Sequence, residues 1–203
     1  MGFNQLRIVG IPPEEKNSAH KTAYQAHDLL DNISYFEDLS LATADMDLIV
    51  GTTSKSRKNR TQLLPSRELN RFLSDRKDLI NNVAIVFGNE TNGLSTEDER
   101  QCQILSTILM ASDYPSINLS HSVMIYAYEL SNIQNTIQTT QSNHSITFRV
   151  FDEKINSFLQ HTAIDQRQPE LYQRILDRCR KLAASDINLV MSLLRYLRNQ
   201  TKN

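Results

Sequence analysis

Polar residues able to contact a ligand end two of three short apolar runs, DLIVGTT (47–53) and VAIVFGNE (83–90), whereas the third run, LRIVG (residues 6–10), ends in a glycine. Each run ends in a glycine or a polar turn, and the polar residues include Thr52, Asn89 and Glu90. In open parallel α/β sheets, ligands bind at the carboxyl ends of the strands. The pattern therefore predicts a ligand site at that edge. A glycine alone is explained more simply by the turn it makes.

The elements that must position these residues alternate along the chain. The three runs are rich in Val and Ile and have the length of strands covered on both faces, and residues 104–111 (ILSTILMA) form a fourth such run. Residues 23–30 and 64–73 carry apolar positions at helical spacing among charged ones. This alternation predicts an α/β fold with a parallel sheet.

The second half of the chain changes in character. Residues 131–147 are almost wholly polar and indicate a linker. The following residues repeat apolar side chains at helical spacing, and Ser185 and Asp186 offer an N-cap for a last helix. We therefore predict a helical extension over residues 148–203.

Composition excludes several classes of protein. The chain has 203 residues, a formal net charge of -1 and a hydrophobic fraction of 39%, typical of a globular protein. Its two cysteines, Cys102 and Cys179, lie far apart and form neither a disulfide framework nor a CxxC metal site. No long apolar run is present for secretion or membrane insertion. We expect a cytoplasmic protein with no metal and no membrane partner.

Basic residues are concentrated in two places. From Arg167 to the end, eight Lys or Arg stand against three acids, a local charge of +5. The second place is the run KSRKNR, with Lys55, Arg57, Lys58 and Arg60. Such groups bind phosphates without sequence preference and with steep salt dependence. A solvated charge run explains them about equally well.

Longer motifs resemble a known family. VAIVFGNETNGLS resembles the second conserved motif of the SpoU (TrmH) branch of the SPOUT methyltransferases, and PSINLSHSVMIYAYEL, about thirty residues later, resembles the third. DLIVGTTSKSR is similar to the strand and loop before the second motif. The beginning, MGFNQLRIVG with DLLDN, and the tail RILDRCRKLAASDINLVMSLLRYLRN resemble the tRNA/rRNA methyltransferase subgroup that includes TrmJ and LasT.

The resemblance implies a fold and a division into domains. It implies a parallel sheet closed by a C-terminal trefoil knot, in which the helix over residues 118–130 is threaded through the preceding loops. The expected domains are a knotted methyltransferase domain over residues 1–130, a polar linker over 131–147 and the helical extension over 148–203.

The resemblance also implies a cofactor, S-adenosylmethionine, bent in the knot. Backbone groups of four loops would hold its adenine, because N–H and C=O groups satisfy the donors and acceptors at the edge of the base. The residues expected at this site are Thr52, Thr53, Gly88, Asn89, Glu90, Leu109, Met110, Ser116, Ile117 and Leu119.

Three residues correspond to the polar motif positions that shape the family's catalytic pocket: Asn118, Ser120 and Glu90. Methyl transfer to a ribose 2′-hydroxyl requires that oxygen to be held in line with the methyl group and to lose its proton. Structural roles compete with these assignments. Asn118 and Ser120 could cap a helix, and Glu90 could favour a helix start. We interpret Tyr126 and Tyr128 as packing residues of the threaded helix.

The resemblance does not include the beginning of the family domain. Family members carry a first strand and helix, with an Asn-x-Gly and a catalytic arginine, ahead of the position that matches Met1. We therefore expect an internal methionine or a truncated gene. The absent strand lies inside the family's sheet, and each buried polar group left unpaired costs about 1–3 kcal/mol. We expect a marginal or adapted sheet and no catalysis unless another residue replaces the arginine.

The leading functional hypothesis is an S-adenosylmethionine-dependent ribose 2′-O-methyltransferase that acts on tRNA or rRNA as a homodimer. An alternative is a non-catalytic RNA-binding module that keeps the knot. A third class, a plain α/β nucleotide-binding enzyme, has neither a Walker motif nor a G-x-G-x-x-G to support it.

Overall fold

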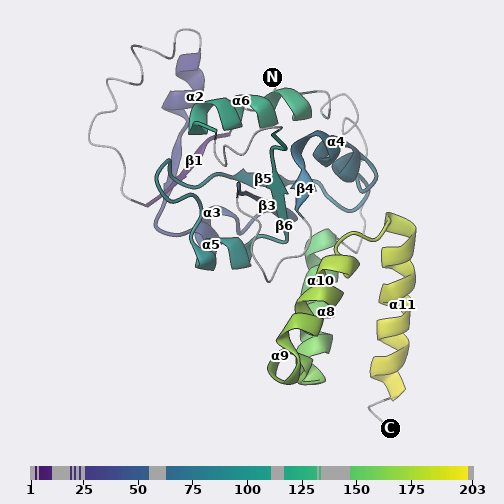
Figure 1. The fold of residues 1–203 in the computed structure, drawn as a ribbon. Coiled ribbons are helices and arrows are strands. Elements are labelled where there is room, and N and C mark those ends of the chain that lie inside the picture. Colours follow the sequence, from purple (N-terminus) through teal and green to yellow (C-terminus); the bar gives the residue numbers. More distant parts are fainter. Residues whose placement is uncertain are drawn as a thin grey trace. The chain divides into compact units, whose positions relative to one another are not determined.

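The structure is a computed structural model (Figure 1). It describes residues 3, 5–10, 19, 21, 23, 26–54, 63–110, 117–131, 133 and 147–200, with the backbone alone for 198–200. The chain divides into two compact units, Met1–Asp45 and Met46–Asn203. Several predictions lie outside the described residues: those for Ser116, for the basic residues Lys55, Arg57, Lys58 and Arg60, and for most of the polar segment 131–147.

The first unit contains a two-stranded parallel sheet. Strand β1 (Arg7–Val9) pairs with β2 (Ser34–Phe36), and helices α2 (His27–Asp31) and α3 (Leu39–Ala42) belong to the same unit. Arg7 ties β1 to the end of α3: its guanidinium donates to the Ala42 carbonyl at 2.6 Å and to the Asp45 carboxylate at 2.7 Å. The strand predicted at residues 6–10 is present, whereas β2 was not predicted.

The second unit contains a four-stranded parallel sheet in the order β4-β6-β3-β5. Its strands are β3 (Leu48–Thr52), β4 (Leu64–Pro65), β5 (Val83–Val86) and β6 (Ile104–Thr107). Among the described residues, β5 pairs with β3 alone. The prediction of an α/β fold with parallel strands is confirmed.

Alternate residues of the strands enter two apolar clusters. Leu48 and Val50 of β3 pack in the larger cluster, with side chains of α4 (Ser66–Ser74) and α6 (Leu119–Leu130). Ile49 packs in the smaller one, beside Cys102 at the end of α5 (Thr96–Gln101). The sheet is therefore covered on both faces, which explains why its strands are almost continuously apolar.

Four helices complete the second unit: α8 (Phe148–His161), α9 (Ile164–Arg167), α10 (Pro169–Cys179) and α11 (Ala184–Gln200). Phe148 and Phe151 are fully buried in the same cluster as the sheet residues, and the Phe148 N–H donates to the Leu79 carbonyl at 2.9 Å. None of the described helices is long and apolar enough to cross a membrane. The division into a methyltransferase domain and a helical extension stays a prediction.

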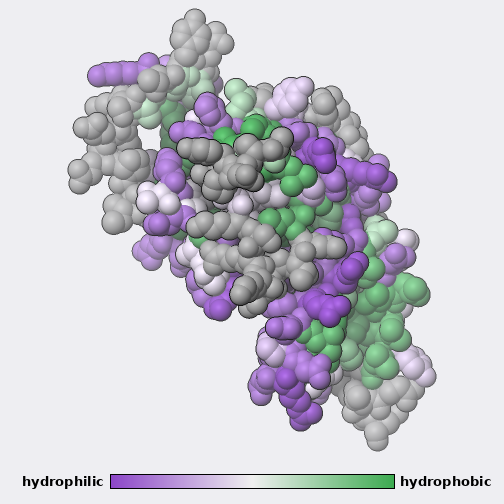
Figure 2. All heavy atoms as spheres, viewed as in Figure 1, coloured by the Kyte–Doolittle hydropathy of each residue, from purple (hydrophilic) through white to green (hydrophobic). Residues whose placement is uncertain are grey.

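Helix α11 carries apolar residues on two sides. Ile187 and Met191 are buried in the core, whereas Leu189 and Leu193 are 71% and 54% exposed. Figure 2 shows an apolar surface over this helix. The helix begins at Ala184, so Ser185 and Asp186 lie in its first turn and not at its N-cap.

The trefoil knot remains a prediction. In the expected knot, α6 is threaded through the preceding loops. Residues 55–62 lie in the loop between β3 and β4, and residues 111–116 lie in the loop between β6 and α6. Both segments lie outside the described residues.

Candidate functional site

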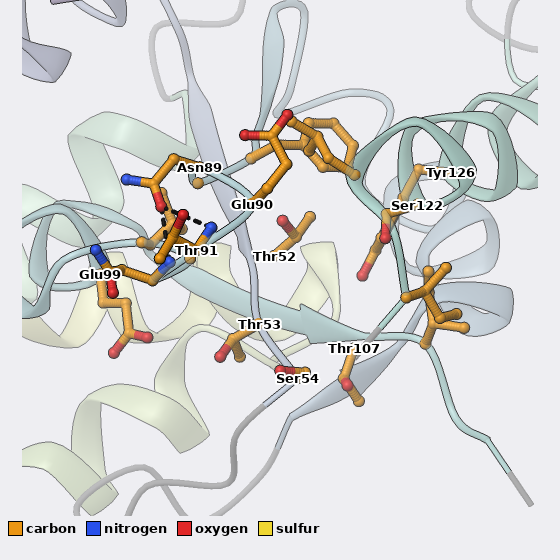
Figure 3. A pocket seen from close by; sticks show the side chains of 18 of the residues that line it. Thr52, Thr53, Ser54, Asn89, Glu90, Thr91, Glu99, Thr107, Ser122 and Tyr126 are labelled. Atoms are coloured by element: carbon orange, nitrogen blue, oxygen red, sulfur yellow. Dashed lines mark hydrogen bonds between the residues drawn. The ribbon is translucent and has the colours of Figure 1, made fainter. Parts of the chain in front are cut away.

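A cavity of about 240 Å³ lies where the carboxyl ends of β3, β5 and β6 meet α6 (Figure 3). This is the edge of the sheet at which ligands bind in open α/β folds. The residues that line it are Thr52, Thr53, Ser54, Phe87, Gly88, Asn89, Glu90, Thr91, Asn92, Gly93, Leu94, Glu99, Thr107, Ile108, Met110, Ile117, Leu119, Ser122 and Tyr126.

Two threonines at the end of β3 form one side of the cavity. The Thr52 hydroxyl donates to the Val86 carbonyl of β5 at 3.0 Å, and the Thr53 N–H donates to the Ser106 carbonyl of β6 at 2.9 Å. The end of β3 is therefore fastened to both neighbouring strands. This makes it a firm support for a ligand.

The loop after β5 is braced by its own asparagine. Asn89 Oδ1 accepts hydrogen bonds from the N–H groups of Thr91 at 3.1 Å and Asn92 at 2.7 Å, and the Asn89 carbonyl accepts one from the Gly93 N–H at 2.9 Å. A Cβ atom on Gly88 would lie 1.9 Å from the carbonyl carbon of Gly93. Glycine is therefore required at Gly88 because the backbone folds back onto it.

Glu90 and Asn89 lie on different sides of this loop in Figure 3: Glu90 is on the side of Tyr126 and Ser122, and Asn89 is on the other. The side-chain oxygen of Asn89 accepts hydrogen bonds inside the loop, whereas Glu90 is exposed and lines the cavity. Of the two, Glu90 is better placed for its side chain to meet a ligand.

The start of α6 forms the opposite side. Asn118 caps this helix, since its Oδ1 accepts from the Ser120 N–H at 2.9 Å and from the Ser120 hydroxyl at 2.6 Å. The capping role that the sequence left open for Asn118 is confirmed. Its catalytic role stays a prediction, and the cap leaves its amide NH2 for other contacts.

An aromatic pair forms the inner wall. The rings of Phe87 and Tyr126 meet edge to face, with centroids 5.6 Å apart. The Tyr126 hydroxyl donates to the Ser106 Oγ at 2.9 Å. Burial raises the pKa of Tyr126 to about 12, opposed by the hydrogen bond to Ser106, so at neutral pH the hydroxyl is protonated.

The structure brings eight of the predicted site residues together around the cavity: Thr52, Thr53, Gly88, Asn89, Glu90, Met110, Ile117 and Leu119. Three others do not line it. Leu109 is 58% exposed, and Asn118 and Ser120 lie beside the cavity at the exposed start of α6. Ser116 and the basic residues 55–60 are outside the described part of the chain.

Eleven lining residues were not predicted, although some of them follow simple signals. Phe87 directly precedes Gly88. Thr107 ends β6 at the same edge as Thr52, and Ile108 directly follows Thr107. Ser122 and Tyr126 follow Leu119 at the i+3 and i+7 spacing of one helix face. Glu99 has no such signal in the sequence. It lies in α5, which was not among the elements expected at the site, and it lines the cavity from there.

The lining combines apolar side chains with loop backbone and hydroxyl groups. Phe87, Ile117 and Leu119 offer apolar surface, while Thr52 and Thr107 add polar groups. This mixture suits a flat heteroaromatic group with hydrogen-bonding edges. Among the described residues, no three His, Cys, Asp or Glu side chains gather as a metal site.

Comparison with known families assigns most of the chain to one family. The family model described as SpoU rRNA Methylase matches residues 1–128, well over half of the chain.

Individual relatives agree with this match. The chain is 34% identical over 133 residues to the uncharacterized tRNA/rRNA methyltransferase LasT of Escherichia coli (strain K12), and this match covers 66% of this chain and 58% of that protein. It is 28% identical over 189 residues to the tRNA (cytidine-2′-O-)-methyltransferase TrmJ of Methanocaldococcus jannaschii, over 87% of this chain and 79% of that one. This chain thus matches less than two thirds of the length of LasT.

Among solved structures, TrmJ from Z. mobilis ZM4 superposes with a TM-score of 0.60 at 20% identity, over 97% of this chain and 88% of that one. At this identity the likeness concerns the fold.

Proposed function

The chain belongs to the SpoU rRNA Methylase family, and from this premise we propose that its cavity binds S-adenosylmethionine for methyl transfer to a ribose 2′-hydroxyl of tRNA or rRNA. The observation that carries the proposal is the convergence of eight expected cofactor residues on one cavity at the carboxyl edge of a parallel sheet. They come from four separate segments of the chain, so their meeting is a property of the fold.

The donor set of the cavity fits this cofactor. Backbone N–H and C=O groups near Thr53, Gly88 and Met110 are suited to the edge of an adenine, and Ile117 and Leu119 are suited to its flat face. When bound, S-adenosylmethionine supplies a methyl group on a positively charged sulfur. The cavity volume of about 240 Å³ is slightly below the range of about 300–1,000 Å³ that is usual for ligand sites.

Glu90 is the residue we assign to the acceptor side of the reaction. Its exposed carboxylate stands on the side of the loop toward Ser122 and Tyr126 of α6. A carboxylate there is able to accept a hydrogen bond from a nucleoside hydroxyl and to hold it in place. Asn118 and Ser120 would shape the same side, Asn118 through its amide NH2.

Contacts to RNA phosphates are assigned to basic residues. We propose that Lys55, Arg57, Lys58 and Arg60 supply them together with the basic C-terminal segment. Because such binding releases counterions from the nucleic acid, it should weaken steeply with salt. From the family resemblance we also propose that the protein acts as a homodimer.

Thermal unfolding in the presence of S-adenosylmethionine tests the cofactor. At a hundred times its dissociation constant, a ligand stabilises a protein by about 2.7 kcal/mol. In a protein of this size this corresponds to a rise in Tm of roughly 5–10 °C. ATP, which shares the adenosine but has no sulfonium, serves as the control and should give a smaller rise. No shift with S-adenosylmethionine contradicts the cofactor assignment.

Transfer of a labelled methyl group to tRNA and rRNA tests the reaction. We expect Glu90→Gln to lower transfer at least tenfold, and Glu97→Gln, an exposed glutamate on α5, to leave it unchanged. A chain that binds the cofactor and RNA but transfers nothing is the non-catalytic RNA-binding module.

A further inference from the structure

Ser106 is a junction of three segments around the cavity. This fully buried residue of β6 donates from its Oγ to the Leu64 carbonyl of β4 at 2.8 Å. The same Oγ accepts the hydrogen bond from the Tyr126 hydroxyl of α6 at 2.9 Å. Its carbonyl accepts from the Thr53 N–H at 2.9 Å. One residue therefore fixes β4, α6 and the end of β3 relative to one another.

Tyr126 is the contribution of α6 to this junction. The residue is 2% exposed and lines the cavity, with its ring edge-on to Phe87. Leu119 and Ser122, which also line the cavity, share its helix face. Any rotation of α6 about its axis would therefore move all three side chains together.

Few hydrogen bonds join α6 to other segments in the described part of the chain. Among the described residues, its C-terminal end is held by Asn70, whose Nδ2 donates to the Glu129 carbonyl at 3.0 Å. The Asn118 cap joins the first turn only to its own neighbours. Of the contacts that the structure describes, the bond from Tyr126 to Ser106 is thus the side-chain hydrogen bond that joins α6 to the sheet.

We propose that the Tyr126–Ser106–Leu64 chain of hydrogen bonds positions α6 so that Leu119 and Ser122 form the cofactor cavity, which makes Tyr126 a positioning residue for the cofactor. The inference rests on the proposed function for the identity of the ligand. Its geometric part, the attachment of α6 to β6 through the Tyr126–Ser106 hydrogen bond, does not depend on a ligand.

Tyr126→Phe in the full chain tests the proposal, because it removes the hydroxyl and keeps the ring against Phe87. Tyr128→Phe is the matched control: it removes the same group from the same helix at a 71% exposed position outside the cavity. Two readouts are measured: the dissociation constant for S-adenosylmethionine by calorimetry, and the amide hydrogen-exchange rates of residues 119–126 without ligand.

The expected result for Tyr126→Phe is a dissociation constant raised about five- to tenfold, the size of one neutral hydrogen bond. Amide exchange in α6 should be faster by a similar factor. Where transfer is measurable, the KM for the cofactor should rise more than kcat falls. Tyr128→Phe should change none of these quantities.

Ser106→Ala and the double variant provide a second test. Ser106→Ala leaves the Tyr126 hydroxyl buried without its acceptor, so it should weaken cofactor binding at least as much as Tyr126→Phe. Because both substitutions remove the same Tyr126–Ser106 hydrogen bond, and Ser106→Ala removes the bond to Leu64 as well, the double variant should bind no more weakly than Ser106→Ala alone. Additive losses would overturn the proposal.

The two proposals fail in different ways. Absence of cofactor binding by the wild-type chain contradicts the proposed function, and amide exchange then decides the positioning role alone. Faster exchange in Tyr126→Phe but not in Tyr128→Phe supports it, and equal rates in the two variants and the wild type overturn it.

Discussion

Arg180 and Asp152 form an ion pair inside the C-terminal helices. The Arg180 Nε lies 2.6 Å from Asp152 Oδ1 and its Nη2 lies 3.1 Å from Oδ2, with the two side chains only 8% and 10% exposed. The pair joins α10 to α8. Asp152 Oδ2 also accepts from Asn156 at 3.1 Å, whose own oxygen accepts from the Tyr172 hydroxyl at 2.8 Å. The ion pair is therefore part of a hydrogen-bonded network.

We predict that Asp152→Ala lowers the free energy of unfolding by about 3–5 kcal/mol, because it leaves the Arg180 guanidinium buried without a counter-charge. Urea unfolding measures the change. The control is Glu153→Ala, which breaks an exposed ion pair with Arg149 on the same helix and should cost less than about 1 kcal/mol. A similar decrease in the free energy of unfolding in both variants would show that the buried ion pair contributes no more to stability than the exposed one.

The second prediction concerns the loop after β5. Gly88→Ala places a Cβ 1.9 Å from Gly93 C and 2.1 Å from Leu94 N, both backbone atoms that no rotamer change can move. We expect loss of S-adenosylmethionine binding in calorimetry together with reduced stability.

Gly93→Ala is the matched control in the same loop. Gly93 has a φ of 71° and open space around its Cβ position, so its substitution carries only the strain of the left-handed conformation, about 1–2 kcal/mol. If Gly88→Ala still binds the cofactor, the loop can move apart to admit the Cβ atom, and the close contact between Gly88 and Gly93 is not needed for binding.

The strands were predictable where burial alone determines them. Val83–Val86 is covered on both faces and is apolar throughout, so its pattern is visible in one sequence. Ser34–Phe36 has three residues and no alternation, and it is a strand because it pairs with β1. Leu64–Pro65 begins an apolar helical pattern, yet pairing with β6 makes these two residues a strand. Such pairing is set by tertiary contacts.

The candidate site was likewise predictable only in part, because some of its features depend on tertiary contacts. The turn at Gly88 was foreseen, but its physical reason, the approach of Gly93, depends on how the loop folds back. Tyr126 and Tyr128 were both interpreted as packing residues; this is right for Tyr126 and wrong for Tyr128, which is 71% exposed. The two differ by two positions on a helix whose apolar residues lie all around it, so the pattern could not rank them.

The third prediction concerns Arg76, a buried arginine whose hydrogen-bond acceptors among the described residues are carbonyls and include no carboxylate. Its guanidinium donates to the carbonyls of Phe72 at 2.9 Å, Lys181 at 2.7 Å and Leu182 at 2.6 Å, and stacks on the Phe72 ring at 3.9 Å. It thereby joins α4 to the turn between α10 and α11. Burial lowers the pKa of Arg76, against the opposing effect of Asp75.

Arg76→Lys should destabilise the chain by about 1–3 kcal/mol for each carbonyl left unpaired, because one ammonium cannot reach acceptors on both sides of the planar guanidinium. Urea unfolding gives the value. Arg71→Lys on the same helix, at an 88% exposed side chain, is the control and should change stability by less than about 0.5 kcal/mol. An equal effect at both positions would argue against the carbonyl contacts as the cause.

The last prediction is a pH dependence that comes from Tyr126. Its pKa is about 12 in the folded chain, raised mainly by burial, against about 10 for an unfolded tyrosine. Because the folded value is the higher one, the stability this group contributes is complete below pH 10 and is lost as pH rises toward 12. Two pH units correspond to roughly 3 kcal/mol. About 2 kcal/mol of that difference is lost between pH 10 and 12. Tyr126→Phe cannot ionise, so between pH 10 and 12 it should lose about 2 kcal/mol less stability than the wild type in urea unfolding. Tyr128→Phe keeps Tyr126, so its stability should change with pH as that of the wild type does. If the stability of Tyr126→Phe instead falls with pH in parallel with the wild type, the Tyr126 hydroxyl is not in the buried environment that the prediction assumes.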